Sequence, residues 1–121
     1  MASTSDPVPQ GARLTVSLAP GEPSVITVTG EIDLHGVTPV RDAVDRALAH
    51  HPHVVLDLAG VSFGDSSFLS TLLKARLDAL ERAGSLTLVA PSSQILRLLT
   101  ITGALELFPV VDKEEDLQAK L

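Results

Sequence analysis

The alternation of short β-rich runs with longer segments of helical periodicity constrains this chain more than any other feature. The β-rich runs lie at residues 13–18, 24–30, 53–58, 85–90 and 107–111. The first two are separated by "APGEP", whose prolines and glycine predict a turn and hence an antiparallel hairpin. Helical segments separate the later runs, so the sequence predicts an α/β fold with a mostly parallel, mixed sheet of about five strands.

Four segments have helical character, and they are expected to flank the sheet. They begin near Thr38, Ser66, Pro91 and Asp112. The second of these segments carries a predicted apolar stripe made of Leu69, Leu72, Leu73, Leu77 and Leu80. The last, "DKEEDLQAKL", is predicted to be a terminal amphipathic helix, which brings the expected number of helices to about four.

Length and charge bound the domain organisation and the choice of partners. With 121 residues, we expect a disordered lead at 1–12 followed by a single domain at 13–121. A net charge of −6 argues against direct binding to nucleic acid and favours a basic protein partner. The chain has no cysteine, no apolar run of membrane-spanning length and no basic leader, which favours a cytoplasmic protein without membrane insertion.

Three loops are expected to meet at one edge of the predicted sheet. They are "GEIDLHG" at 30–36, "AGVSFGDSS" at 59–67 and "APSS" at 90–93, and each follows a predicted strand. The carboxyl ends of parallel strands point to the same edge, where ligands of open α/β sheets bind. A functional site is therefore expected where these loops cluster.

The second loop places Asp65, Ser66 and Ser67 directly before a helix. Asp65 is a good N-cap, and small polar residues satisfy free N–H groups in a first turn, so a purely capping role is one interpretation. A serine hydrolase is another, since "GDS" follows a strand. That chemistry needs a base and oxyanion donors. We reject it by comparison with the GDSL-type esterases, whose base is a histidine near the C-terminus and whose oxyanion donors include an asparagine. Here all four histidines precede the serines, and the chain has no asparagine.

The histidine-rich stretch "HHPH" at 50–53 raises the alternative of a metal site. Pro52 prevents helical spacing of the imidazoles, and the nearest acids, Asp45 and Asp57, show no sign of converging on them. A metal site requires convergent ligands with defined geometry. We therefore expect a solvated turn here, and neither a metal nor a cofactor in this protein.

Three stretches resemble a known family. "GEIDL", "VVLDLAGVSFGDSSFLSTLL" and "LTLVAPSSQILRLLTITGALELFPV" resemble, in order and spacing, the bacterial anti-sigma factor antagonists of the STAS-domain family. The D-S-S block after a "DLxGVxF" strand is the most specific element. The resemblance implies a STAS-like fold and a non-catalytic protein that regulates transcription by partner switching.

What the resemblance implies in detail is a phosphorylation switch. By position the acceptor is Ser66, which would be phosphorylated by an anti-sigma factor that is a GHKL-type serine kinase and dephosphorylated by a PP2C-type phosphatase. The unmodified protein would bind the anti-sigma factor and release its sigma factor. Asp65 and Ser67 flank the acceptor, and Asp33 matches an aspartate that lies beside the phosphosite in the family.

The chain departs from the family at Phe68 and Ser70, where glycines are usual. Phe68 is interpreted either as an exposed aromatic anchor for a partner or as a residue packed under a neighbouring loop. Glu31 is interpreted either as a solvated loop acid or as a partner contact. The departure leaves an alternative function open, namely an unphosphorylated STAS scaffold or regulatory module of a signalling complex or transport system.

Overall fold

The computed structural model describes residues 13–117, which form a five-stranded sheet with three α-helices. The strands are β2 (Thr15–Ala19), β3 (Ser24–Ile32), β4 (His53–Gly64), β5 (Ser85–Val89) and β6 (Val110–Val111), and they lie side by side in that order. β2 pairs with β3 in an antiparallel hairpin, and all other neighbours are parallel. The mixed sheet of five strands and its N-terminal hairpin confirm the sequence prediction. The predicted lead at 1–12 lies outside the described residues.

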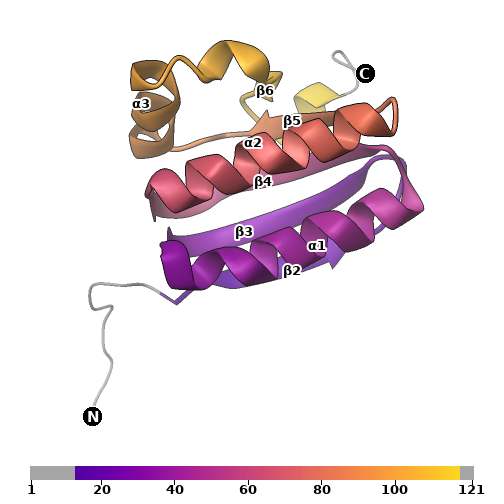
Figure 1. Cartoon of the computed structure of the whole chain (residues 1–121), viewed down its shortest axis with the longest axis horizontal. Helices are drawn as coiled ribbons and strands as arrows, with labels where there is room; N and C mark the ends of the chain where they lie inside the picture. The colour runs from indigo at the N-terminus through magenta and orange to yellow at the C-terminus, as the bar shows by residue number, and fades with distance from the viewer. Residues whose placement is uncertain (1–12, 118–121) are drawn as a thin grey trace.

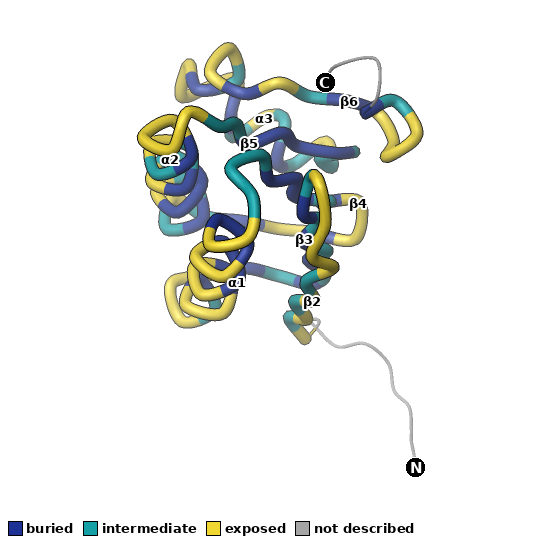
Figure 2. Tube along the Cα trace, turned by 90° about the vertical axis from the view of Figure 1, so that its right-hand side faces the viewer, coloured by how far each residue is buried: buried dark blue, intermediate teal, exposed yellow. Residues whose placement is uncertain are grey.

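Two helices cover one face of the sheet. Figure 1 shows α1 (Val37–His50) and α2 (Ser66–Glu81) side by side against the strands, and Figure 2 shows the same layer edge-on with its buried residues turned inward. The main core lies between these helices and the sheet. It includes Ile26, Val28, Leu56, Leu58 and Leu88, all with 0% exposed surface. The third helix, α3 (Ser93–Ile101), packs against β4.

The buried face of α2 differs from the predicted leucine stripe. Leu72 is fully buried as expected, whereas Leu77 and Leu80 are 53% and 48% exposed. Ala75 and Ala79 lie in the interface instead. Alanine presents little volume, so the helix can approach α1 and the sheet closely along this side. The buried face combines the large residues Phe68 and Leu72 in the first half of the helix with the small Ala75 and Ala79 in the second half, whereas the prediction used leucines alone.

The opposite face of the sheet carries a second, smaller core made of Val55, Val89, Val111 and Leu117. Leu117 reaches it after a single 3-10 turn at Glu114–Asp116. The expected helix over 112–121 is therefore wrong for its described part, and residues 118–121 lie outside the described range. Residues 112–116 contain no apolar side chain that could form a helical stripe. Within residues 13–117, no helix is long and apolar enough to span a membrane.

Candidate functional site

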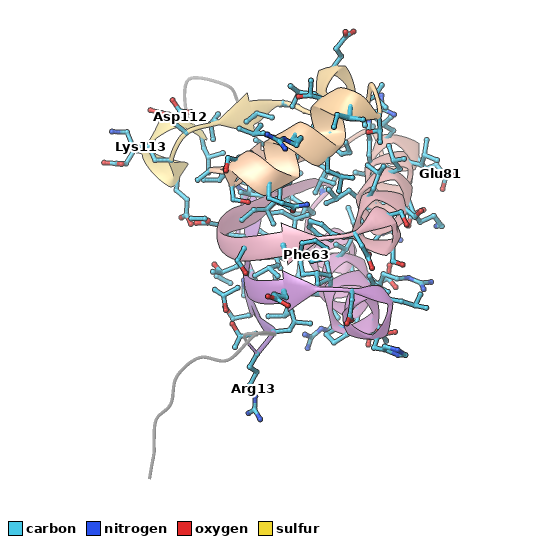
Figure 3. The ribbon with its side chains drawn as sticks, turned by 90° about the vertical axis from the view of Figure 1, so that its left-hand side faces the viewer. Arg13, Phe63, Glu81, Asp112 and Lys113 are labelled. Atoms are coloured by element: carbon cyan, nitrogen blue, oxygen red, sulfur yellow. The ribbon has the colours of Figure 1, made fainter. Side chains whose placement is uncertain are left out.

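The three loops predicted to meet do lie together at the carboxyl edge of the sheet. The backbone N–H of Asp65, after β4, donates to the carbonyl of Ile32, at the end of β3, at 3.3 Å. On the other side of β4, the side chain of Gln94 in α3 hydrogen-bonds Gly64. Figure 3 looks onto this edge, with Phe63 near its centre. The predicted convergence of the loops is confirmed.

Asp65 is the N-cap of α2, as the sequence predicts. Its Oδ1 accepts hydrogen bonds from the backbone N–H groups of Ser67 at 2.9 Å and Phe68 at 3.3 Å. Ser66 is the first helical residue and is exposed, whereas Ser67 is half-buried. Among residues 13–117, nothing hydrogen-bonds the Ser66 hydroxyl. Asp65 therefore caps the helix, and the neighbouring Ser66 hydroxyl is exposed with no hydrogen-bond partner among residues 13–117.

Asp33 forms a similar cap one strand away. Its Oδ1 accepts from the N–H groups of His35 at 3.0 Å and Gly36 at 3.1 Å, which stabilises the 3-10 turn Leu34–Gly36 ahead of α1. Asp33 itself is exposed. The hydrogen bond between Asp65 and Ile32 keeps this loop next to the Ser66 loop.

Phe68 is completely buried, which corrects the interpretation of this residue as an exposed partner contact. A Cβ placed on Gly64 would come within 2.6 Å of Phe68 Cδ2 and 2.9 Å of Ile95 Cδ1. The ring therefore occupies the space that a side chain at position 64 would need. The aromatic residue found at a family glycine position points into the core and adds no bulk to the surface around Ser66.

Sequence reasoning missed two exposed apolar residues at this edge. Phe63 is 41% exposed near the end of β4, where it pairs in register with Glu31 of β3, and Leu34 is 64% exposed directly after Asp33. Glu31 is half-buried. Phe63 lies at a β-bulged strand end, where alternation between the two faces of a strand breaks down, so the periodicity of the sequence does not indicate its exposure.

Sequence reasoning also missed Gln94. Its carboxamide Oε1 accepts from the backbone N–H of Gly64 at 3.0 Å, and its Nε2 donates to the carbonyl of Gly64 at 3.3 Å. β4 is paired with β5 only up to Asp57, so Gly64 has no strand neighbour on that side. The local sequence around Gln94 does not predict this contact, because the contact joins residues thirty positions apart.

The site is acidic. Glu31, Asp33 and Asp65 lie at the edge, and neither residues 30–36 nor residues 59–70 contain Lys or Arg. Within the part of the chain that the structure describes, no three His, Cys, Asp or Glu side chains are grouped as metal ligands. In the histidine-rich turn, the Nδ1 of His53 lies 2.8 Å from the hydroxyl of Ser85. This turn is at the opposite end of β4 from Ser66.

Comparison with known proteins agrees with this architecture. The model of the family described as "Mlab, STAS domain" matches residues 15–109. The chain is similar to an anti-sigma F factor antagonist from Paenibacillus polymyxa, with 27% identity over 99 residues that cover 80% of this chain and 85% of the relative.

Solved structures give the same picture. An anti-sigma factor antagonist from Mycobacterium paratuberculosis matches with 28% identity and a TM-score of 0.75, over 88% of this chain and 93% of the other. The Bacillus cell fate determinant SpoIIAA in its phosphorylated form matches with 22% identity and a TM-score of 0.69, over 89% and 98% of the two chains. At that identity the second likeness concerns the fold alone. With a family match that spans most of its length and a fold that agrees, this chain belongs to the STAS-domain family.

Proposed function

We propose that this protein is an anti-sigma factor antagonist and that phosphorylation of Ser66 turns off its binding to the anti-sigma factor. The similar proteins from Paenibacillus polymyxa and Mycobacterium paratuberculosis are both anti-sigma factor antagonists. The observation that carries the proposal is the setting of Ser66, exposed on the first turn of a capped helix at the edge where three loops meet.

The Ser66 hydroxyl is suited to accept a phosphoryl group from a kinase. Its oxygen attacks the γ-phosphorus of ATP, an Oγ–P bond forms, and the bond between the γ-phosphorus and the β,γ-bridging oxygen breaks to release ADP. The hydroxyl proton passes to a base of the kinase, which also supplies ATP and Mg²⁺. This chain contributes position and access, since the hydroxyl is exposed and its backbone is fixed by the Asp65 cap.

A phosphate on Ser66 should leave the fold intact. Asp65 already accepts the N–H groups of Ser67 and Phe68, so the phosphate gains mainly from the positive end of the α2 dipole. That interaction is worth about 0.3–1 kcal/mol near a surface helix terminus. Repulsion from Asp65 and Asp33 opposes it. These two effects on the free energy of folding are small and of opposite sign. We therefore expect phosphorylation to change the charge of the surface and to leave the fold unchanged.

The surrounding surface suits a partner with basic and apolar groups. Glu31, Asp33 and Asp65 supply negative charge, while Phe63 and Leu34 supply exposed apolar area. A phosphate adds about −1.5 to −2 charge to this surface. Like charge brought into an interface costs several kcal/mol, and each ~1.4 kcal/mol changes affinity tenfold.

The resulting cycle is a switch between partners. The unmodified protein binds an anti-sigma factor that is itself a GHKL-type serine kinase, and this binding releases the sigma factor. The kinase then phosphorylates Ser66 and the complex dissociates. A PP2C-type phosphatase uses water to cleave the phosphate from Ser66, which returns the protein to its binding form. This chain would have no catalytic role in the cycle and would require no cofactor.

The test uses the whole protein as bait in lysate of the source cells, followed by ATP and Mg²⁺. We expect retention of a GHKL-type kinase, release on addition of ATP, and a mass gain of one phosphoryl group on Ser66. The matched variant Ser66→Ala should retain the same kinase and stay bound after ATP. Release of the variant by ATP would contradict the proposal.

The same experiment separates the alternative function. Retention of transport or signalling-complex subunits, with no mass change after ATP, would identify a STAS scaffold or regulatory module. Such a module would use the same edge of the sheet, and substitution of Ser66 by alanine would then have no effect on release.

A further inference from the structure

Gln94 forms two hydrogen bonds with the segment that leads to Ser66, on the side of β4 where β5 no longer pairs with it. β4 loses its pairing with β5 after Asp57 but remains paired with β3 as far as Gly64. Gly64 is buried, so its N–H and C=O groups need partners on the open side. The carboxamide of Gln94 supplies both an acceptor, at 3.0 Å, and a donor, at 3.3 Å.

The chemistry of this contact requires an amide. The carboxamide of glutamine presents an adjacent neutral acceptor and donor in a single planar group, as a neighbouring peptide would. A glutamate at this position could still accept from the N–H of Gly64 but could not donate to its carbonyl. A leucine, which is apolar and one atom shorter, would leave both buried backbone groups without a partner.

The contact adds to three others that fix the same short segment. The N–H of Asp65 is held by Ile32, and the Asp65 side chain caps α2. The ring of Phe68 fills the space beside Gly64. Gln94 holds the remaining side of this segment and so links the acceptor loop to α3. The start of α3 is itself fixed by the Ser92 cap.

We propose that Gln94 is a positioning residue for phosphorylation, which holds the Gly64 peptide so that the Ser66 hydroxyl is presented in a reactive position. This inference rests on the proposed function, because it concerns the acceptor role of Ser66. Gln94 does not take part in phosphoryl transfer. Its effect on the reaction passes through the backbone of Gly64 and Asp65, which precede the acceptor.

The expected consequence is a loss of rate with little loss of binding. Displacement of a reacting atom by about 1 Å can cost about a hundredfold in rate. The docking surface formed by Glu31, Asp33, Asp65, Phe63 and Leu34 does not include Gln94. We therefore expect Gln94→Leu to lower kcat for phosphorylation by about tenfold or more, while KM for this protein changes by less than about twofold.

The experiment measures phosphorylation by the kinase retained by the wild-type bait, together with amide hydrogen exchange by NMR. Gln94→Leu should expose the Gly64 amide to exchange and lower kcat. Gln94→Glu keeps the acceptor and should fall between wild type and Gln94→Leu in kcat. The control is Thr100→Ala on the same helix, whose hydroxyl bonds only the carbonyl of Leu96 within α3 and whose loss should leave both readouts unchanged.

The outcomes separate the two proposals. If wild type is phosphorylated on Ser66 and Gln94→Leu reaches the same kcat despite faster exchange of the Gly64 amide, the positioning role is wrong and the switch stands. If wild type is not phosphorylated by any retained kinase, the proposed function fails first, and the positioning role fails with it. If Gln94→Leu does not fold, the decision rests on Gln94→Glu, for which a wild-type kcat would overturn the inference.

Discussion

The loops after β3 and β4 begin in the same way and are then held differently. In both, an aspartate follows a strand and accepts two backbone N–H groups of the next turn. After Asp65, the chain enters a 16-residue helix, and Phe68 anchors its first turn in the core. After Asp33, the chain makes a 3-10 turn, and Leu34 points to solvent with 64% of its surface exposed.

The difference fits the different tasks that we propose for the two loops. The loop with Ser66 is fixed by core packing and by the hydrogen bonds to Ile32 and Gln94, as an acceptor for group transfer should be. The loop with Asp33 offers charge and apolar area, and its 3-10 turn Leu34–Gly36 buries no residue before Val37, as a contact surface should. The first is therefore sensitive to changes inside the protein, and the second to changes at its surface.

The largest expected effect comes from the core anchor. Phe68→Ala removes a fully buried ring and should lower the free energy of unfolding by about 3–5 kcal/mol. Leu34→Ala, the matched change in the other loop, should stay within about 0.5 kcal/mol of wild type. Urea denaturation of both variants measures the contrast. Similar losses in the two variants would break the comparison between the loops.

The next effect concerns Phe63, which lies between the two loops and is 41% exposed. Phe63→Ala should weaken binding to the anti-sigma factor by about 2 kcal/mol, or roughly thirtyfold, because half-exposed aromatic residues are common anchors of interfaces. Stability should change little. The control is Ile101→Ala, which removes an exposed apolar residue at the end of α3. Titration calorimetry would refute the role of Phe63 if both variants bound like wild type.

Loss of either cap should have a smaller effect on stability. Asp65→Ala and Asp33→Ala each remove a side-chain acceptor for two N–H groups, and each should cost about 1 kcal/mol in unfolding free energy. Only Asp65→Ala should also lower the kcat for Ser66 phosphorylation, since only this cap starts the helix that carries the acceptor. Thermal unfolding and kinase assays measure the two effects, and an equal loss of kcat in both variants would contradict the division of tasks.

The smallest expected effect is on stability and comes from Glu114, which lies outside both loops and so provides a control for changes made within them. A hydrogen bond to Asp57, then partial burial and the negative charge of Asp57, raise the pKa of Glu114 above its ordinary value. The folded state therefore binds this proton more tightly than the unfolded state. This tighter binding of the proton stabilises the folded state. The stabilisation is complete at pH values below the unfolded pKa of Glu114 and is lost as the pH rises through the folded pKa.

Replacement of Glu114 by glutamine removes that charge. Glu114→Gln should stabilise the protein slightly at neutral pH, by less than about 1 kcal/mol because the pair is mostly exposed, and should remove this part of the pH dependence. Ser66 phosphorylation should be unchanged. Unfolding curves collected between acidic and neutral pH test the prediction, which is wrong if wild type and variant keep the same pH dependence.

The sequence predicts the sheet and the meeting of the loops because both follow from general rules. The hairpin follows from turn residues, and the convergence of the loops follows from parallel strands ending at one edge. The Asp65 cap is local, so its residue type is enough to predict it. These features depend on neighbours in the sequence or on topology alone.

The features that were missed depend on tertiary packing. The side of α2 that faces the core is decided by how closely Ala75 and Ala79 allow it to approach its neighbours, which leucine spacing does not reveal. The direction of Phe68 depends on the absence of a side chain at Gly64, and the contact of Gln94 depends on the early end of β5 pairing. Over residues 112–117 the predicted helix is replaced by a 3-10 turn, after which Leu117 packs into the smaller core on the far face of the sheet.

Titration of the purified anti-sigma factor with unmodified and Ser66-phosphorylated protein tests the switch most directly. The account predicts binding at least about a hundredfold weaker for the phosphorylated form, since several kcal/mol of interfacial repulsion are expected. Circular dichroism of the two forms should coincide. Equal affinities, or a large loss of helix on phosphorylation, would contradict a block that acts at the surface without refolding.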